Sequence, residues 1–365
     1  MKVLFIWHAA VAETYQKYIA ELAEHPDLNI TLLVPPGSTE GSRYIQAFIP
    51  KNAKYKVLVA HSVLAGDNLT SFPPALPYFL WKEKPDIIHL FEEPWHNIAA
   101  YLTFWSKLIC PKAKLIFQTF QNQVEDYRPN WVRTQKRTFE RSSAAISCTE
   151  EGKEVLLHWG FKKPIHVIYP GVETKLFSLQ DASALRGKLG LKEFTIGYFG
   201  RMVREKGVDD LIAAAKTLNF SYQLLFMGNG PDKPRLKEQA PNAIWLDAVA
   251  PNEISKYYSA LDCLVLPSRT TKTWKEQFGR VLVEAMLCGV PVIGSSSGEI
   301  PKVIGDAGLI FTEQNPSDLT RRITEIRNNA SLREELKKKG MERGRSFDWK
   351  YAADRVYKVY ENIIN

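Results

Sequence analysis

The sequence has few cysteines and no long apolar run, and both absences exclude classes of protein. Its four cysteines in 365 residues have no paired spacing, so neither a disulfide framework nor a zinc site is indicated. They are Cys110, Cys148, Cys263 and Cys288. Because each lies among apolar residues, we expect buried thiols in a reducing cytoplasm. No segment reaches the roughly 18 uninterrupted apolar residues that a membrane-spanning helix needs.

Low-complexity sequence is also missing, as is the Gly-x-Gly-x-x-Gly turn that follows the first strand of nicotinamide-dependent oxidoreductases. With 45% hydrophobic residues, the chain has enough apolar material for two domains of ordinary size. The N-terminal run Val3 to Trp7 imitates a signal peptide, but it is short and is followed by His8. We therefore expect a first strand there.

Positive charge is in excess, with a formal net charge of +8, yet acids interleave with most of the basic residues. This pattern favours solvated helix faces over a nucleic-acid-binding surface. The segment Arg128 to Arg141 combines basic residues with Trp131 and Phe139. It is a candidate for contact with an anionic membrane surface or an anionic acceptor, although an ordinary amphipathic helix explains the same pattern.

Strand-like segments alternate with helical patterns through both halves of the chain, which predicts an α/β protein with two parallel sheets covered by helices. We place the first domain at residues 1–175 and the second at 176–346. A last helix at 347–365 is expected to cross back to the first domain. Ligands of such folds bind at the carboxyl ends of the strands, so we expect the active site in the cleft between the domains.

The most informative segment is Glu-Gln-Phe-Gly-Arg-Val-Leu-Val-Glu, from Glu276 to Glu284. Helical spacing begins after Gly279, which places Glu284 inside a helix and Glu276 in the loop before it. Eight residues span roughly 12 Å in a helix, and the free N–H groups of the helix start attract phosphate. Taken alone, so loose a spacing favours the ordinary interpretation, in which Glu276 is an exposed loop acid and Glu284 lies on a solvated helix face.

A second cluster, Gly-Arg-Met-Val-Arg-Glu-Lys-Gly, lies between a strand-like segment ending at Phe199 and a helical pattern starting at Val208. Gly200 allows a sharp backbone turn there. Arg201, as a planar fork, and Lys206, as a mobile charge, are then able to converge on phosphate oxygens. Each cation alone reads as an ordinary surface residue. Together, beside two glycines, they favour phosphate binding.

These strings resemble those of the retaining family 4 glycosyltransferases, which have the GT-B fold of two Rossmann-like domains. The resemblance covers nearly the whole chain. It also rests on Gly228-Asn-Gly-Pro231, Tyr257 to Ser268, Glu284 to Pro291, Gly298-Glu-Ile-Pro301 and Pro170-Gly171-Val172. It implies transfer of a hexose from a nucleotide-sugar to an acceptor, without a cofactor or a divalent metal.

The resemblance assigns roles to individual residues. Arg201 and Lys206 match the diphosphate-binding pair, Glu284 the acid that binds the ribose, and Glu276 the acid that contacts the hydroxyls of the donor sugar. Arg201, Lys206 and Glu276 are the expected catalytic residues. The full set of expected donor-binding residues is Gly200, Arg201, Lys206, Gly228, Val249, Glu276, Phe278, Gly279, Arg280 and Glu284.

The nucleobase is expected near Gly228 to Pro231 and Leu246 to Val249. Asp247 departs from the family there, because a glycine often follows this strand. UDP-glucose or another UDP-hexose is the expected donor, with a GDP-mannose-dependent mannosyltransferase as the alternative. A nucleotide-sugar epimerase or a binding protein on the same fold also stays open.

Two mechanisms are open by which the sugar keeps its anomeric configuration. The acceptor attacks on the face that the diphosphate leaves, or a covalent glycosyl-Glu276 intermediate forms first. We favour same-face attack, because no second acid is obviously paired with Glu276. Either way, cleavage creates an anionic leaving group, which positive charge at the phosphates stabilises.

The acceptor side of the first domain departs from the family twice. The loop from His8 to Ala12 lacks the usual glycines, and Gln118-Thr-Phe-Gln-Asn122 stands where a histidine is common. An amide replaces a hydrogen bond of histidine but is no base at neutral pH. The candidate acceptor-side residues are Glu93, His96, Gln118, Gln121 and Asn122. We expect a saccharide or lipid-linked acceptor, in envelope polysaccharide or glycoconjugate synthesis, with a location in the cytoplasm or at the inner face of the membrane. The sequence gives no indication of oligomeric state.

Overall fold

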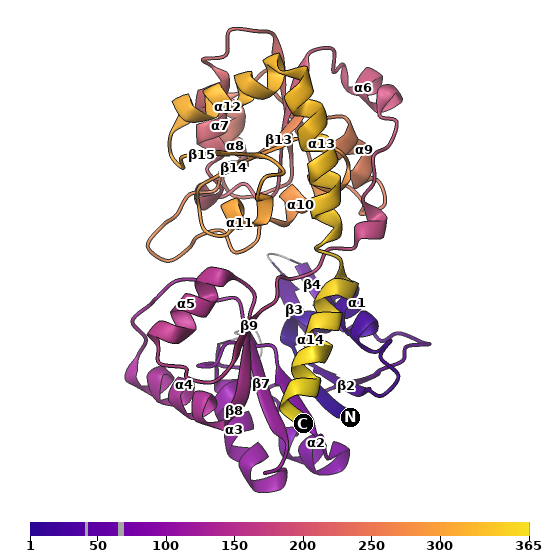
Figure 1. The fold of residues 1–365 in the computed structure, drawn as a ribbon, viewed down its shortest axis with the longest axis vertical. Helices are drawn as coiled ribbons and strands as arrows, with labels where there is room; N and C mark the ends of the chain where they lie inside the picture. The colour runs from indigo at the N-terminus through magenta and orange to yellow at the C-terminus, as the bar shows by residue number, and fades with distance from the viewer. Residues whose placement is uncertain (41–42, 65–68, 365) are drawn as a thin grey trace. The chain divides into compact units, whose positions relative to one another are not determined.

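A computed structural model describes residues 1–40, 43–64 and 69–364, and it divides the chain into two compact units (Figure 1). The first unit consists of Met1–Gly171 and Trp349–Asn365, and the second of Val172–Asp348. The divisions predicted from the sequence follow residues 175 and 346, whereas in the structure residues 172–175 and 347–348 belong to the second unit. They do so because Val172 N donates to Phe347 O at 2.7 Å, which ties the two ends of the second unit together.

The first unit has a seven-stranded sheet whose strands all pair in parallel, in the order β5-β2-β1-β6-β7-β8-β9. In that order the strands are Lys56–Val59, Asn29–Val34, Lys2–Ile6, Ile87–Leu90, Lys114–Thr119, Ser142–Ser147 and Ile165–Val167. The α-helices are α1 (Glu13–Leu22), α2 (Leu76–Glu83), α3 (Asn97–Ile109), α4 (Pro129–Arg141), α5 (Glu150–His158) and α14 (Trp349–Ile364), and the 3-10 helix η1 is His8–Val11.

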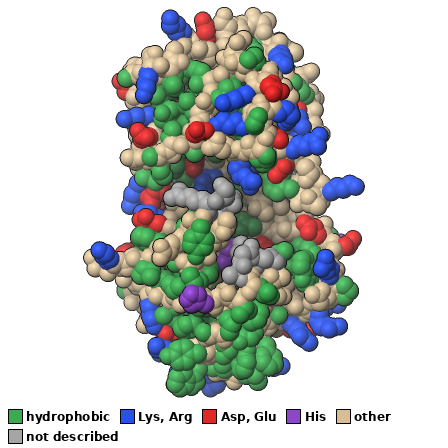
Figure 2. Space-filling model, turned by 180° about the vertical axis from the view of Figure 1, so that it is seen from behind, with side chains coloured by type: hydrophobic (Ala, Val, Ile, Leu, Met, Phe, Trp, Pro, Cys, Tyr) green, Lys and Arg blue, Asp and Glu red, His purple; other side chains and the backbone are tan. Residues whose placement is uncertain are grey.

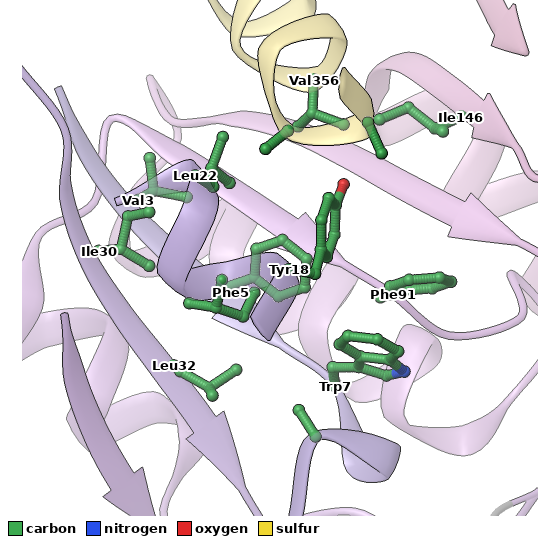
Figure 3. Close-up of a cluster of buried hydrophobic side chains, with 14 of the residues drawn as sticks. Val3, Phe5, Trp7, Tyr18, Leu22, Ile30, Leu32, Phe91, Ile146 and Val356 are labelled. Atoms are coloured by element: carbon green, nitrogen blue, oxygen red, sulfur yellow. The ribbon is translucent and has the colours of Figure 1, made fainter. Parts of the chain in front are cut away.

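Side chains of β1 alternate between two apolar cores, as the period of a strand requires. Val3 and Phe5 lie in the core that α1 and α14 cover, shown in Figure 3. Leu4 and Ile6 lie in the core on the other face, with buried side chains of α2, α3, α4 and α5. Helices therefore cover both faces of the sheet, which explains why most residues of β1, β2, β6, β7 and β8 are buried.

The helix α14 is part of the first core although it follows the second unit in the chain. Val356 packs beside Tyr18 and Ile146 (Figure 3), and Tyr360 contacts His89 Nδ1 through its hydroxyl at 2.6 Å. Burial lowers the pKa of His89 to about 3, so this histidine is a neutral core group. Gly171 lies against Trp349, because a Cβ on Gly171 would stand 2.4 Å from the indole.

A two-stranded antiparallel hairpin, β3 (Gly37–Glu40) with β4 (Arg43–Gln46), was not predicted. Its sequence follows two prolines and contains few β-branched residues, so it reads as a loop. Backbone pairing and contacts beside β2 form it instead: Ala47 N donates to Pro36 O at 2.8 Å, and Phe48 N donates to Val11 O at 2.9 Å.

The second unit has a six-stranded parallel sheet in the order β12-β11-β10-β13-β14-β15. In that order the strands are Ile244–Leu246, Tyr222–Met227, Phe194–Phe199, Cys263–Leu266, Val292–Ser295 and Leu309–Phe311. Counted along the unit, this is the order 3-2-1-4-5-6 of a Rossmann fold. The strand order reverses between β10 and β13, where such sheets bind ligands at the carboxyl ends.

The helices of the second unit cover both sides of this sheet (Figure 1). One group has α7 (Val208–Ala215) packed on α8 (Lys233–Gln239) and α12 (Pro316–Asn328), and the other has α10 (Arg280–Leu287) packed on α9 (Ile254–Ser259) and α13 (Ala330–Arg345). The remaining helices are η2 (Thr174–Leu176), α6 (Ser183–Leu189), η3 (Arg204–Lys206) and α11 (Ile300–Ile304).

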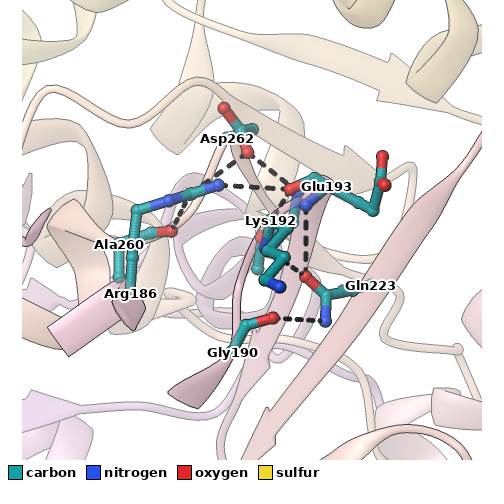
Figure 4. Close-up of polar contacts among 8 residues, drawn as sticks. Arg186, Gly190, Lys192, Glu193, Gln223, Ala260 and Asp262 are labelled. Atoms are coloured by element: carbon teal, nitrogen blue, oxygen red, sulfur yellow. Dashed lines mark hydrogen bonds and ion pairs between the residues drawn. The ribbon is translucent and has the colours of Figure 1, made fainter. Parts of the chain in front are cut away.

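Polar contacts fix the amino ends of β10 and β13 (Figure 4). Arg186 donates to Ala260 O at 2.6 Å and to Glu193 O at 3.2 Å, and it pairs with Asp262 at 3.4 Å. Gln223 accepts from Lys192 N at 2.8 Å. These contacts join the amino end of β10 to that of β13 through Arg186 and to that of β11 through Gln223, at the end of the sheet opposite the ligand-binding edge.

Candidate active site

The loops that follow β10 and β11 touch backbone to backbone, and glycine makes this contact sterically possible. Gly200 has a φ of 152° and Gly228 a φ of 128°. A Cβ on Gly228 would lie 2.1 Å from Gly200 O, a separation that no side chain tolerates. Gly200 N also donates to Met227 O at 2.9 Å. The two glycines therefore form one continuous backbone surface at the carboxyl edge of the sheet.

Lys206 and Glu276 form an ion pair at the point where the strand order reverses. Lys206 Nζ donates to Glu276 Oε2 at 2.6 Å, and Ser268 Oγ donates to the same oxygen at 2.7 Å. The Lys206 Nζ also stands 4.7 Å from the centroid of the Trp274 ring. Glu276 is buried, with a side chain only 8% exposed. Charge-assisted contacts of this length in a buried setting fix both groups in position.

The loop that carries Glu276 is held at its backbone as well. Glu276 O accepts from Glu299 N at 3.0 Å, and a Cβ on Gly298 would stand 2.1 Å from the same oxygen. The carboxylate therefore enters the site from a segment clamped against the start of α11.

The start of α10 lies a few residues further along the same loop. Gly279 has a φ of 72° as the residue before the helix, and a Cβ there would stand 2.9 Å from Leu266 Cδ2. Phe278 is buried, and its ring centroid lies 5.4 Å from that of Phe347. Arg280 is exposed at the first position of the helix. A helix start anchored in this way presents its N–H groups and positive dipole end at a fixed place.

Glu284 lies on α10 and faces α9. Its Oε2 accepts from the hydroxyl of Tyr258 at 2.6 Å, and both side chains are buried. Burial raises the pKa of Glu284, although the Tyr258 hydrogen bond and Arg280 act in the opposite direction. The tyrosine therefore fixes the orientation of an acid that solvent hardly reaches.

Arg201 follows the first glycine of the cluster and is exposed. Its carbonyl accepts from the buried hydroxyl of Tyr198 at 2.6 Å, which fixes the backbone. Within residues 1–40, 43–64 and 69–364, its guanidinium makes no hydrogen bond or ion pair. Nearby, Arg269 binds both oxygens of the buried Asp210 at 2.7 and 2.6 Å, which ties the start of α7 to the segment after β13.

A lysine occupies the region where β11 and β12 end. Lys233 Nζ donates to four oxygens: Gly228 O at 2.9 Å, Asn229 Oδ1 at 2.9 Å, Leu246 O at 3.2 Å and Asp247 Oδ1 at 2.6 Å. Asp247, which stands where the family often has a glycine, is therefore paired with Lys233. Val249, in the segment beyond it, is half-buried.

Sequence reasoning did not pick out Ser268, Trp274, Tyr258, Lys233 or Arg269 as functional. Ser268 and Tyr258 lie in the segment from Tyr257 to Ser268, which was used only for its resemblance to a family. Their contacts lie 8 and 26 residues away along the chain, so nothing local marks them.

The first unit holds a cavity of about 450 Å³ at the carboxyl ends of its own strands. His8, Glu92, Tyr44, His61 and Ser62 are among its lining residues. The strand order reverses here too, between β1 and β6, and the loops after these two strands carry His8 and Glu92.

His8, Glu92 and His96 form a charged group beside this cavity. Glu92 Oε1 accepts from His8 N at 2.8 Å and contacts His8 Nδ1, while Oε2 lies 3.5 Å from His96 Nδ1. Burial alone would raise the pKa of Glu92, but the two histidines outweigh it and lower this pKa to about 2. Burial alone would lower the pKa of His8, but the charge and hydrogen bond of Glu92, together with the charge of Glu93, outweigh burial and raise this pKa.

The lining residues of this cavity include none of the five predicted acceptor-side residues. Glu93 accepts from Phe120 N at 3.0 Å and from the Thr119 hydroxyl, and burial raises its pKa. Gln118 is buried and donates to Cys148 Sγ at 3.4 Å. Gln121 donates to Gln123 O at 3.0 Å, and Asn122 donates to Glu151 Oε2 at 3.3 Å. The fifth, His96, lies 3.5 Å from Oε2 of Glu92, which lines the cavity.

Comparison with known proteins places both units in one family. The model of "Glycosyltransferase Family 4" matches residues 13–176, and the model of "Glycosyl transferases group 1" matches residues 181–343. The chain belongs to glycosyltransferase family 4. The predicted family is thereby confirmed.

Two curated relatives show how far the similarity of this glycosyltransferase extends. An uncharacterized glycosyltransferase of Methanocaldococcus jannaschii is 30% identical over 228 residues, which cover 61% of this chain and 60% of that protein. D-inositol 3-phosphate glycosyltransferase 1 of Catenulispora acidiphila is 28% identical over 243 residues, which cover 60% of this chain and 57% of that protein. The chain thus spans about 60% of the length of the curated relatives it matches.

Solved structures match this glycosyltransferase over its whole length. The sucrose-phosphate synthase of Thermosynechococcus elongatus has a TM-score of 0.77 at 20% identity, with coverage of 100% of this chain and 99% of that chain. Anabaena HepE in complex with UDP has a TM-score of 0.78 at 18% identity, with coverage of 99% and 100%. At these identities the likeness shows the fold, which is the predicted GT-B fold of two Rossmann-like domains.

Proposed function

We propose that this glycosyltransferase transfers a hexose from a nucleotide-sugar to a saccharide or lipid-linked acceptor, with retention of configuration and without a divalent metal. The observation that carries the proposal is the group of Lys206, Ser268 and Glu276 at the point where the strand order of the second sheet reverses. Nucleotides bind at this position in Rossmann folds, and the start of α10 adds a site for phosphate.

The ion pair suggests how the donor is received. Lys206 Nζ donates to Glu276 Oε2 at 2.6 Å. A diphosphate beside it competes for the lysine, and the carboxylate is then available to accept hydrogen bonds from sugar hydroxyls. Arg201, whose guanidinium makes no ion pair within the described residues, supplies the second cation for the diphosphate. Glu284, held by Tyr258, is the acid that binds the ribose.

Charge development decides what these residues do in the reaction. As the bond between sugar and diphosphate breaks, the leaving group gains negative charge, and Arg201, Lys206 and the helix start stabilise it. When Lys206 turns to the diphosphate, Ser268 Oγ still donates to Glu276 Oε2, and a carboxylate that accepts a hydrogen bond is a weaker nucleophile than an unbound one. This supports same-face attack by the acceptor, with its proton passing to a phosphate oxygen. A glycosyl adduct trapped on Glu276 and found by mass spectrometry would contradict that choice.

UDP-glucose or another UDP-hexose is the first donor to test. The Anabaena HepE structures that resemble this fold contain UDP, UDP and glucose, or UDP-glucose. The loops beyond β11 and β12, joined by Lys233, are where the nucleobase is expected. GDP-mannose is the second donor to test.

The cavity of the first unit supports a polyhydroxyl acceptor, because its lining offers hydroxyl and imidazole groups. Ser38, Ser62 and Ser71 lie along it together with His8 and His61. An acceptor of this chemistry fits the synthesis of envelope polysaccharides or glycoconjugates, with the enzyme in the cytoplasm or at the inner face of the membrane.

The test is release of nucleotide from UDP-, GDP- and ADP-sugars in excess chelator, first without and then with saccharide acceptors. We compare the wild type with Lys206→Ala and with Lys188→Ala, an exposed lysine of α6 that serves as the control. Release from one class of donor that is lost in Lys206→Ala and retained in Lys188→Ala supports the proposal. The proposal is contradicted if both variants release nucleotide equally. It is also contradicted if release requires added metal, or if the donor is isomerised and no sugar is transferred.

A further inference from the structure

Two helices of the first unit expose large apolar side chains. On α2, Tyr78 is 52% exposed and Trp81 is 62% exposed; on α3, Phe104 is 58% exposed and Leu108 is 61% exposed. Figure 2 shows a broad group of apolar side chains at the lower end of this unit. Single exposed apolar residues are ordinary, but a cluster of large ones on neighbouring helices marks an interaction surface.

These side chains are not needed for the core. The inner faces of the same helices already bury Leu76 and Leu80 on α2, and Leu102 on α3. The hydroxyl of Tyr101 on α3 donates to Pro74 O, just before α2, at 3.1 Å, which joins the two helices. Their outer sides therefore form one surface.

The rings on this surface also lie against one another. The centroids of Tyr78 and Trp81 are 6.2 Å apart, and those of Phe104 and Trp105 are 5.2 Å apart. We call the outer side of α2 and α3, with Tyr78, Trp81, Phe104 and Leu108, the aromatic surface; Trp105 is partly buried and packs between this surface and the core.

Positive charge surrounds the aromatic surface. Residues 71–82 and 97–124 contain no Asp or Glu. The exposed lysines on and beside the two helices are Lys82, Lys84, Lys107 and Lys112. Lys82 Nζ lies 5.5 Å from the ring centroid of Tyr78. Two acids follow α2: Glu83 is bound by Lys56 at 2.7 Å, and the exposed Asp86 accepts from Lys2 N at 2.8 Å.

The neighbouring helix α4 extends this charge. It packs against α3 and exposes Arg133, Lys136 and Arg137. Glu140 is its single acid. The aromatic surface is therefore bordered by cations on α4 as well as by its own lysines.

We propose that the aromatic surface of α2 and α3 docks on an anionic phospholipid bilayer, with its rings at the level of the headgroups and its lysines on the phosphates. Tyrosine and tryptophan suit this level because one end of each ring is polar. Amphipathic surfaces gain affinity both from buried apolar area and from attraction to anionic lipid. A second copy of the chain fits less well, since a symmetric contact would bring the same lysines together.

The test is sedimentation with vesicles of phosphatidylcholine, alone or mixed with phosphatidylglycerol. It needs neither donor nor acceptor, so its outcome is independent of the proposed function. We compare the wild type with Trp81→Asp/Phe104→Asp and with Lys82→Glu/Lys107→Glu. Tyr351→Asp is the matched control, because Tyr351 is 54% exposed on α14, against the opposite face of the sheet. Circular dichroism checks that each variant folds.

The expected result is binding to the vesicles that contain phosphatidylglycerol, weakened by roughly tenfold or more in each double variant and unchanged in the control. Binding should also fall as salt rises, because the Debye length shortens from about 10 Å at 0.1 M to about 3 Å at 1 M. No binding by the wild type, or equal binding by the Trp81/Phe104 variant, overturns the proposal. Self-association of the wild type that this variant abolishes, without vesicle binding, identifies a protein contact and overturns it too.

Discussion

Replacing Lys206 by alanine tests both the chemistry and the packing of the second unit. The substitution removes a cation from the proposed diphosphate site and also removes a side-chain donor of Glu276 Oε2. Loss of one preorganised donor of this kind costs about 3 kcal/mol in the transition state, or on the order of 10²-fold in kcat. The assay is steady-state nucleotide release with the preferred donor.

The same substitution also affects stability, because it leaves the Glu276 carboxylate buried with Ser268 as its remaining side-chain donor among the contacts above. A buried group that loses a charged hydrogen-bond partner typically costs about 1–3 kcal/mol. Glu276→Gln removes the charge, so Lys206→Ala should be less destabilising in that background. We expect a coupling energy of about 1–2 kcal/mol between the two sites, measured by urea unfolding of the two single variants and the double variant.

Two results would refute this reasoning. If Lys206→Ala costs the same free energy of unfolding in the wild type and in the Glu276→Gln background, the ion pair contributes nothing to the fold. If kcat falls only as far as the fraction of folded protein falls, the lysine has no separate role in the transition state.

Three further predictions concern other contacts. Tyr258→Phe removes the hydroxyl that orients Glu284, so the KM for the donor should rise by roughly tenfold with a smaller change in kcat. His8→Asn should lose more stability at pH 5.5 than at pH 8. Because the pKa of His8 is raised in the folded state, its ion pair with Glu92 stabilises the fold fully below pH 6.5, and this stabilisation is lost as the pH rises through the folded-state pKa of His8. The pKa of Glu92 is about 2, so Glu92 stays charged at both pH 5.5 and pH 8. Gly228→Ala should destabilise the second unit by more than about 2 kcal/mol, because of its positive φ and the carbonyl 2.1 Å from the new Cβ. Gly187→Ala, in open space on α6, should be neutral or stabilising by about 0.5–1 kcal/mol.

Each of these three predictions has an outcome that would contradict it. An unchanged KM in Tyr258→Phe would mean that Glu284 does not bind the donor. A difference between wild type and His8→Asn that is constant from pH 5.5 to 8 would show that the ion pair with Glu92 does not form. Equal unfolding free energies for the two alanine variants would show that the loops after β10 and β11 are not in contact.

The sequence predicts the framework well because its signals are local and periodic. Alternating apolar strands and helices, together with the strings around Arg201 and Glu276, are enough for the GT-B fold and the family. The hairpin of residues 37–46 was missed because backbone pairing, rather than an apolar pattern, forms it.

Pairings within the candidate site depend on strand order, which no local pattern contains. Lys206 meets Glu276 across 70 residues, and His8 meets Glu92 across 84, because each pair follows two strands that are neighbours in a parallel sheet. The same limit applies to two neighbouring acids: Glu92 lines the cavity of the first unit, whereas Glu93 accepts from Thr119 and Phe120. Adjacent residues of one loop face different surroundings, and only the fold tells them apart.

The path of the chain through α14 has a consequence for synthesis on the ribosome. The first unit begins at Met1, but Trp349, Val356 and Tyr360 complete its core only after the whole second unit has been translated. Until then, the apolar face of its sheet that α14 covers stays open to water and to chaperones. The second unit, one continuous segment, is able to reach its native state first, so a truncation before residue 349 should leave it folded while the first unit aggregates.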